Sequence, residues 1–346
     1  MIDLKSLTLL ELQQEMEKLG EKKFRAKQIY GWIHEKLADR FEEMTNLSKD
    51  LRERLEQEYE LPVLKIIQVQ KSAQDGTCKF LFGLPDGHVI ESVLMRYHHG
   101  NSVCISSQVG CRMGCRFCAS TLGGLKRGLR PSEMLDQIYQ IQKWSKERVH
   151  NVVVMGTGEP LDNYDALLRF LNLLTCEGGL HISQRNVTVS TCGIVPRMRQ
   201  LAEEKLQITL ALSLHASSQE KRKMLMPVAN RYELSDVLDA CRYYFEQTKR
   251  RISFEYSLVG GVNDGEEDAE ELIALIRSLN CHVNLIPVNP IKERDYVQSG
   301  HQTIVNFKNK LEKSGIVVTI RREMGRDIDG ACGQLRRSYL DMEKER

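Results

Sequence analysis

The run Cys111-Arg-Met-Gly-Cys115-Arg-Phe-Cys118 places three cysteines close together, and this spacing is the most informative feature of the chain. Three such thiolates can hold three irons of a [4Fe–4S] cube, which leaves the fourth iron without a protein ligand. An open metal position can bind a substrate or a cofactor, whereas a cluster with four thiolates mainly carries electrons. The run therefore indicates a reactive cluster.

Other interpretations of the three cysteines stay open. A structural zinc site takes four ligands, and no second C-x2-C or H-x3-H pair follows at the spacing of a zinc ribbon or finger. Three unligated thiols are a further alternative, although this spacing rarely arises by chance. A protein that only carried electrons would need a fourth cysteine close to the run, which has none.

The run resembles that of the radical S-adenosylmethionine (SAM) enzymes, as does the aromatic Phe117 before its third cysteine. The resemblance implies that the amino and carboxylate groups of SAM occupy the open iron. It also implies that the cluster supplies the electron that cleaves SAM into methionine and a 5′-deoxyadenosyl radical. We therefore expect one [4Fe–4S] cluster on Cys111, Cys115 and Cys118, with SAM as the second cofactor.

Length and composition are typical of a protein of the reducing cytoplasm. The chain has 346 residues, 41% of them hydrophobic, which suffices for one large or two unequal domains. Its first residues lack the features of a signal peptide, and no run of about eighteen apolar residues occurs. Ten cysteines in this length do not indicate a secreted disulfide scaffold. We expect a cytoplasmic monomer without a membrane partner.

Basic residues gather at two places, although the net charge is only +2. One group surrounds the three-cysteine run and the other surrounds Cys332: Arg112, Arg116, Lys126, Arg127 and Arg130, then Arg321, Arg322, Arg326, Arg336 and Arg337. Charged runs are usually solvated faces. Their position beside chemically important cysteines nevertheless favours an anionic substrate such as RNA.

The first hundred residues predict a small accessory domain. Three helices are expected between residues 6 and 60, the first opened by the capping box Thr8-Leu-Leu-Glu11. Strand-like runs then flank the turn Pro85-Asp86-Gly87, where proline fixes φ and glycine accepts a positive φ. We predict an α/β domain at 1–95, with a role in RNA recognition, and a catalytic domain at 96–346 that carries Cys332 in a C-terminal extension.

The rest of the chain alternates short β-branched runs with longer helical patterns. Strands are expected at 103–106, 151–155, 186–190, 208–213, 252–257, 282–286 and 317–320. Helices are expected at 132–147, 164–175, 196–204, 233–248, 267–279 and 301–313. Apolar strands separated by helices indicate a parallel sheet. The predicted fold class is α/β: a partial (β/α)6 TIM-like barrel with the small N-terminal domain. A flavodoxin-like open sheet is the alternative.

Polar segments follow four of the predicted strands, at the ends where parallel α/β proteins place their chemistry. They are Met155-Gly-Thr-Gly158-Glu159-Pro, Ser190-Thr-Cys-Gly, Ser213-Leu214-His215 and Asn289-Pro. Each alone could be ordinary loop chemistry, but four on one face indicate a binding site. The first resembles the GGE segment of radical SAM enzymes, which holds the SAM ammonium. We expect SAM to be bound by Gly158, Glu159, Ser190, Ser213, Leu214, His215 and Asn289.

Two further cysteines stand apart from the cluster run. Cys104 lies on the first predicted barrel strand, and Cys332 lies in a segment of small residues near the C-terminus. A single cysteine is usually a buried, small apolar residue. Cys332 differs, because its small neighbours leave it uncrowded and nearby arginines favour its thiolate.

Over nearly its full length the chain resembles the RlmN/Cfr family of radical SAM RNA adenosine methyltransferases. The resemblance rests on Phe24-Arg-Ala-Lys-Gln-Ile29, the segment from Cys104 to Cys118, Met155 to Tyr164, Ser213-Leu-His-Ala216 and Asp327 to Leu335. Pro160 after Glu159 is similar to the RlmN branch, whereas the Cfr branch tends to have alanine there. Ala119-Ser120-Thr121, Cys192 and Gly330 depart from the usual residues, and these changes are small.

The resemblance implies methylation of C2 of adenosine 2503 in 23S rRNA, at the peptidyl-transferase centre, and of adenosine 37 in tRNA. One SAM would methylate Cys332, and a second would supply the radical that activates this methyl group. The methyl carbon would then add to the base. Cys104 would release the product through a transient disulfide with Cys332, and Glu91 would accept the C2 proton. An exposed strand carboxylate is the simpler interpretation of Glu91.

The same resemblance implies an external electron donor of the flavodoxin or ferredoxin type, and two SAM per turnover. Two other enzyme classes stay open. A Cfr-like C8 methyltransferase, which gives antibiotic resistance, shares these catalytic residues and differs in its product. A radical SAM enzyme for a small metabolite would need neither the Cys104/Cys332 pair nor the N-terminal helices.

Overall fold

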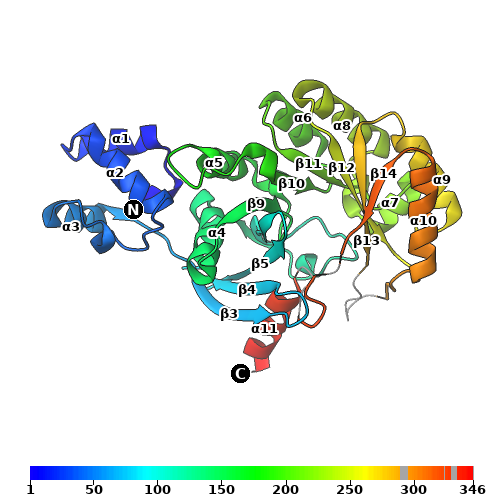
Figure 1. The fold of residues 1–346 in the computed structure, drawn as a ribbon, viewed down its shortest axis with the longest axis horizontal. Helices are drawn as coiled ribbons and strands as arrows, with labels where there is room; N and C mark the ends of the chain where they lie inside the picture. Colours follow the sequence, from blue (N-terminus) through cyan, green and yellow to red (C-terminus); the bar gives the residue numbers. More distant parts are fainter. Residues whose placement is uncertain (289–294, 323, 329–332, 346) are drawn as a thin grey trace.

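A ten-stranded sheet runs through the molecule in the computed structural model, which describes all residues except 289–294, 323, 329–332 and 346 (Figure 1). The strand order is β14-β13-β12-β11-β10-β9-β6-β5-β4-β3. The sheet has two parts that differ in direction. From β14 to β6 all neighbours are parallel, and from β6 to β3 all neighbours are antiparallel.

The parallel part is the predicted barrel. Its strands are β6 (Gly100–Cys104), β9 (Val149–Val154), β10 (Val187–Thr191), β11 (Thr209–Ser213), β12 (Ile252–Leu258), β13 (Cys281–Pro287) and β14 (Val317–Ile320). The connecting helices are α4 (Pro131–Ser145), α5 (Tyr164–Thr175), α6 (Val195–Glu203), α8 (Leu234–Thr248), α9 (Glu266–Ile276) and α10 (His301–Lys313). The predicted fold class is thereby confirmed.

The strand β12 shows how the sequence sets the two faces of the barrel. Every residue of this strand is buried. Phe254, Tyr256 and Leu258 belong to the large apolar core, whereas Glu255 and Ser257 line a cavity on the other face. Because side chains alternate along a strand, one run of residues serves both the helix layer and the barrel interior.

The N-terminal residues form the three predicted helices, α1 (Leu9–Lys18), α2 (Lys23–His34) and α3 (Lys49–Glu58), beside a short parallel pair, β1 (Ile2–Asp3) and β2 (Tyr59–Glu60). The capping box is confirmed: the Thr8 hydroxyl accepts from the Glu11 amide, and the Glu11 carboxylate accepts from the Thr8 amide at 2.8 Å. Local signals are therefore sufficient to start α1.

The predicted turn at 85–87 joins β4 (Cys78–Gly83) and β5 (Val89–Tyr97), and Gly87 has a φ of +83°. A third strand, β3 (Lys65–Lys71), completes an antiparallel meander. Through its pairing with β6, β5 joins the meander to the barrel sheet. The strands at 65–97 therefore extend the barrel sheet, while the division of domains at residue 95 stays a prediction.

A buried ion pair fastens the N-terminal helices to α4. The Lys5 Nζ lies 2.6 Å from Asp136 Oδ1 and donates to the Pro62 carbonyl, and both charged side chains are 1% exposed. Nearby, His34 Nδ1 lies 2.7 Å from the Tyr139 hydroxyl. Together these contacts fix the helices against the outer side of the barrel.

Besides the β1–β2 pair, three features near the site or the C-terminus were not predicted from the sequence. They are the short helix α7 (Gln219–Leu225), the C-terminal helix α11 (Gln334–Glu345) and the hairpin of β7 (Gln108–Gly110) with β8 (Leu125–Gly128). The hairpin encloses residues 111–124, which we call the cluster loop because they include the three-cysteine run. Among the described residues, no helix has the length and apolarity needed to cross a membrane.

Candidate active site

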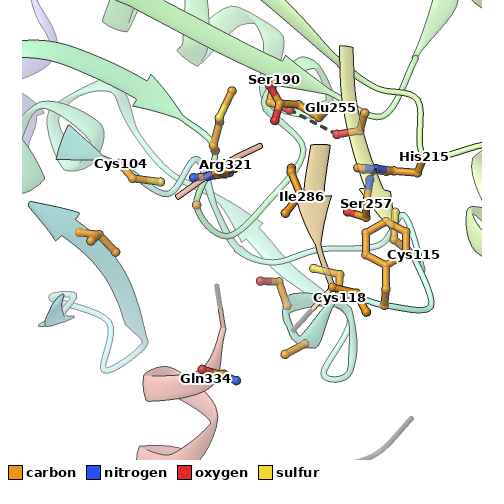
Figure 2. Close-up of a pocket in the computed structure, with 18 of the residues that line it drawn as sticks. Cys104, Cys115, Cys118, Ser190, His215, Glu255, Ser257, Ile286, Arg321 and Gln334 are labelled. Carbon is orange, nitrogen blue, oxygen red and sulfur yellow. Dashed lines mark hydrogen bonds between the residues drawn. The ribbon is translucent and has the colours of Figure 1, made fainter. Parts of the chain in front are cut away.

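A cavity of about 780 Å³ lies at the carboxyl ends of the parallel strands (Figure 2). Most of the residues singled out in the sequence line it: Cys104, Cys111, Cys115, Cys118, Gly158, Glu159, Ser190, Ser213 and His215. These residues come from four strand ends and the cluster loop. Parallel strands thus bring together side chains that are far apart in the sequence.

The three cysteines of the cluster loop line this cavity and influence one another electrostatically. Burial, with a smaller contribution from the charge of Cys118, raises the pKa of Cys111 to about 12. Burial also raises the pKa of Cys115 well above its usual value, with added contributions from Cys118 and Cys111. Without a cation, three ionised thiols would therefore be costly to hold here.

This donor set fits an iron–sulfur cube better than a single metal ion. No group of three Cys, His, Asp or Glu side chains in the described part of the chain could hold one ion. In a [4Fe–4S] cube each thiolate binds a different iron, so the sulfurs need not converge on one point. Iron would also offset the charge of thiolates that burial disfavours.

The glycines after β9 make room for the protein chain itself. A Cβ at Gly156 would lie 2.8 Å from the Ile105 carbonyl, and one at Gly158 would lie 2.7 Å from Gln108 Cβ. These two glycines also line the cavity. They therefore let the loop after β9 pack against the residues after β6, in addition to leaving the ligand space that the sequence suggested.

Glu159 is buried, and its carboxylate is held by backbone donors. Its Oε1 accepts from the Leu161 amide at 3.1 Å and its Oε2 from the Cys192 amide at 2.8 Å. Burial raises the pKa of this carboxyl group, whereas these hydrogen bonds lower it. The carboxylate is thus fixed in one orientation and retains lone pairs for a ligand cation.

His215 is held as a neutral ring. Its Nδ1 accepts from the Ser257 amide at 2.9 Å, so the ring proton resides on Nε2. Burial lowers the pKa of His215 to about 3. The ring packs against Phe117 of the cluster loop, with centroids 4.7 Å apart. His215 therefore offers a hydrogen-bond donor next to the three cysteines.

The other predicted SAM residues differ in position. The Ser190 and Ser213 hydroxyls lie 3.4 Å apart on neighbouring strands. Leu214 belongs to the apolar core, and its amide donates to the Glu255 carbonyl, so its side chain does not face the cavity. Asn289 lies outside the described residues, and so does Cys332.

The described residues on both sides of Cys332 reach the site. Three residues that precede Cys332 in the chain line the cavity, namely Gly325, Arg326 and Ile328, and so does Gln334, which follows it. The described residues on each side are held by the meander. The Asp75 carboxylate accepts from the Gly325 amide at 2.9 Å, and the Glu91 carboxylate accepts from the amides of Gly333 and Arg336.

Glu91 is buried, which contradicts the simpler interpretation of it as an exposed strand carboxylate. Besides capping α11, it forms an ion pair with the fully buried Lys79 at 3.1 Å. The strand pattern could not reveal this, because the contacts come from the preceding strand and from the C-terminal helix. Its role as proton acceptor stays a prediction.

Sequence analysis missed several polar residues of the cavity. Glu255 is buried in its wall, where its Oε1 accepts from the Asn284 amide group at 2.9 Å and where burial raises its pKa. Gln334 also lines the cavity, and so does Arg321, which the sequence indicated only as part of a basic group. The available signal was the alternation of polar and apolar residues in β12, which we had interpreted only as a strand.

Comparisons with known proteins agree with this geometry. Residues 2–61 match the family described as the ribosomal RNA large subunit methyltransferase N-terminal domain, and residues 105–276 match the radical SAM superfamily. Radical SAM enzymes use a [4Fe–4S] cluster and SAM.

Whole-chain relatives extend the match. A protein of Lachnospira eligens, named as a probable dual-specificity RNA methyltransferase RlmN, is 66% identical over 99% of this chain and 97% of its own length. One of Clostridium novyi with the same name is 54% identical over 97% of this chain and 98% of its own length. The crystal structure of a radical SAM methyltransferase from Sphaerobacter thermophilus matches with a TM-score of 0.92 and 41% identity, covering 96% of this chain and 99% of that one. The chain therefore belongs to the RlmN family of radical SAM RNA methyltransferases.

Proposed function

We propose that this protein methylates C2 of adenosine in RNA, with adenosine 2503 of 23S rRNA and adenosine 37 of tRNA as its targets. The main support is the shared cavity. Cys104, the three cysteines of the cluster loop, Glu159 and the residues flanking Cys332 all line it. Residues for radical generation and for methyl transfer are thus gathered in one place.

Each residue has a task in this proposal. Cys111, Cys115 and Cys118 hold a [4Fe–4S] cluster, which when bound supplies the electron for SAM cleavage. Glu159 accepts from the ammonium of SAM, and the Nε2–H of His215 donates to another polar atom of SAM. The glycine Gly158 and the hydroxyls of Ser190 and Ser213 complete the SAM site.

The remaining steps belong to the cysteine pair. Cys332 accepts a methyl group from one SAM and loses a hydrogen atom of that group to the radical derived from the second SAM. Its carbon then bonds to adenine C2. Cys104 then attacks the Cys332 sulfur, so that a disulfide forms as the carbon–sulfur bond breaks. Glu91 accepts the C2 proton. We infer that its ion pair with Lys79 and its bonds to the amides after Cys332 loosen when RNA binds.

The N-terminal domain recognises RNA in this proposal. Its match to a domain of ribosomal RNA methyltransferases supports this role. Phe24 on α2 is 51% exposed, and the Arg25 guanidinium lies 4.9 Å from its ring centre. An exposed aromatic ring beside a cation is a common platform for an unstacked base.

The proposal also covers the supply of electrons and SAM. The electron comes from a flavodoxin- or ferredoxin-type donor, and the protein works as a cytoplasmic monomer. Two SAM are consumed in each turnover. Equal yields of S-adenosylhomocysteine and 5′-deoxyadenosine for each methylated base, measured by chromatography, would support this stoichiometry.

The test of the proposal separates the two cysteines of the pair. Cys104→Ala should accumulate a covalent protein–RNA adduct on a denaturing gel, because no thiol can release it. Cys332→Ala should give neither adduct nor methylated RNA. The matched control is Cys281→Ala, which changes a cysteine at the start of β13, at the opposite end of the strand from the cavity.

Product analysis completes the test. Nuclease digestion and mass spectrometry of wild-type product should identify 2-methyladenosine. A product methylated at C8 would contradict the C2 assignment and favour a Cfr-like reaction. Normal turnover by Cys104→Ala without an adduct would contradict the disulfide step.

A further inference from the structure

Arg222 is a fully buried arginine that the proposed reaction does not use. It lies on α7 with a relative exposure of 0% and does not line the cavity. Arginine is almost never fully buried without a partner of opposite charge, because removing the guanidinium from water is costly. Its surroundings therefore require an explanation.

Within the described part of the chain, most donors of this guanidinium lack an acceptor. The Nη2 donates to the Cys192 carbonyl at 2.7 Å. The Nε and Nη1 atoms are buried and have no hydrogen-bond partner there. No described carboxylate forms an ion pair with Arg222 either. A buried cation with unused donors indicates a site prepared for negative charge from elsewhere.

The helix that carries Arg222 is fastened to the cluster loop. The Arg116 amide donates to the Leu225 carbonyl at 2.9 Å, and Leu225 and Met226 belong to an apolar cluster that also contacts Cys115 and Phe117. Burial lowers the pKa of Arg222, and the charges of Cys192 and Cys115 partly offset this shift. The guanidinium is therefore electrostatically coupled to a thiol of the loop.

The loop after β10 also makes room for this side chain. Gly193 has a φ of +102°, and a Cβ there would lie 3.1 Å from Arg222 Nη2. Any larger residue would be strained and would press on the guanidinium. The fold thus provides a closed position for a cation next to Cys192, which itself lines the cavity.

We propose that Arg222 is the buried counter-charge of the iron–sulfur cluster and that it raises the reduction potential of the cluster. This inference rests on the proposed function, because it assumes a cluster held by Cys111, Cys115 and Cys118. Reduction adds one negative charge to a centre that already carries three thiolates. Net charge and hydrogen bonds to the sulfurs are the main protein influences on such potentials.

Arginine suits this task because its guanidinium stays charged when it is buried. Arg222 is therefore a positioning residue that acts on the cluster through Cys115 and the Cys192 backbone.

The first measurement compares thermal stability with and without the cluster. Arg222→Met removes the charge and keeps most of the volume, and Arg222→Lys keeps the charge. Cluster loading should raise the Tm of the wild-type protein and of Arg222→Lys more than that of Arg222→Met. The cluster-free Arg222→Met protein should be at least as stable as cluster-free wild type, because an unpaired buried charge has been removed.

The second measurement is an EPR-monitored redox titration of the reconstituted proteins. At a fixed potential, Arg222→Met should have a ratio of reduced to oxidised cluster roughly tenfold lower than wild type, which is about 59 mV for one electron. Arg222→Lys should restore part of the difference. The control is Arg250→Met, a half-buried arginine just before β12, at the opposite end of the barrel. It should leave the potential unchanged.

Each outcome is decisive. Equal potentials and equal gains in Tm for wild type and Arg222→Met would overturn the role of Arg222 while leaving the proposed function intact. An Arg222→Met protein that failed to fold without the cluster would also contradict the proposal, because it would show a purely structural role. Wild-type protein that takes up no iron would instead refute the cluster assignment and the proposed function with it.

Discussion

Two buried cations show how two regions of the molecule differ. Lys5, between the N-terminal helices and α4, has the Asp136 carboxylate 2.6 Å away and a backbone carbonyl besides. Arg222, behind the cluster loop, has one backbone carbonyl, and among the described residues two of its buried nitrogens have no acceptor. In the first region the buried charge has partners within the protein, as is usual for a group that only stabilises the fold. The second leaves charge unsatisfied, which is typical of a region that receives a bound group.

The meander resembles the Lys5 region in this respect. Lys79 is fully buried beside Glu91, and Glu91 also accepts from two backbone amides at the start of α11. These groups hold the start of α11 against the meander. Lys5 and Lys79 thus have buried carboxylate partners, whereas Arg222 has none among the described residues. This contrast leads to three further predictions.

The largest effect is expected at the Lys5 pair. Asp136→Ala should lower the free energy of unfolding by about 3–5 kcal/mol, because it leaves a buried ammonium without its counter-ion. Urea unfolding of the cluster-free protein would measure this change. The double variant Lys5→Met with Asp136→Leu should recover most of the loss, since no charge is then buried. Equal stability of Asp136→Ala and wild type would show that the buried Lys5 does not need its counter-ion, which would contradict the contrast drawn with Arg222.

A smaller effect is expected from acid, through His34. Burial, followed by the charge of Lys5, lowers the pKa of His34 from 6.5 to about 3. A depressed histidine pKa stabilises the fold above pH 6.5, and this contribution is lost as the pH falls toward 3. Through His34 alone, the free energy of unfolding should therefore fall by about 1.4 kcal/mol between pH 7.5 and 5.5.

His34→Gln isolates this contribution. The variant should lose less stability than wild type over the same pH range, as measured by urea unfolding at both pH values. Identical pH dependence in the two proteins would mean that His34 is protonated without cost. Its environment would then be more polar than the nearby charge of Lys5 and the contact with Tyr139 indicate.

The smallest effect is expected at an exposed ion pair. Lys49 and Glu53 lie 3.6 Å apart on α3 with side-chain exposures of 84% and 57%. Lys49→Ala should change the free energy of unfolding by about 0.5 kcal/mol or less, because solvent screens such pairs. Urea unfolding of this variant would measure the change, which can be compared directly with that of Asp136→Ala. A loss close to that of Asp136→Ala would show that burial is not what separates the charge pairs of this protein.

The sequence alone was sufficient for most of the barrel. β12 was expected at 252–257 and observed at Ile252–Leu258, and α5 was expected and observed over the same twelve residues. These elements depend on hydrophobic periodicity, which is a local property. The pairing of β5 with β6 was not predicted, because the two-residue turn between them, His98-His99, lacks the glycine or asparagine that usually marks a tight hairpin.

The missed site residues have a similar explanation. Arg222 lies in the polar run Gln219-Glu-Lys-Arg-Lys223, which is typical of a solvated helix. Its burial comes from the packing of α7 under the cluster loop. Glu255 was hidden in a strand whose other residues belong to the core. The three cysteines of the cluster loop, by contrast, lie within eight consecutive residues. Their spacing is a local property, so the sequence was sufficient to predict them as a ligand set.

The antiparallel meander has a consequence for dissecting this protein into fragments. A chain shortened to begin near residue 100 would remove the partner of β6 and leave that strand as a new edge of the sheet. Unprotected edges with free amides and carbonyls pair with other chains and cause aggregation. The shortened chain would also lack Lys5, which would leave the buried Asp136 carboxylate without its ion-pair partner. The N-terminal region is therefore no detachable module, and transplanting it between relatives would require the whole sheet to move with it.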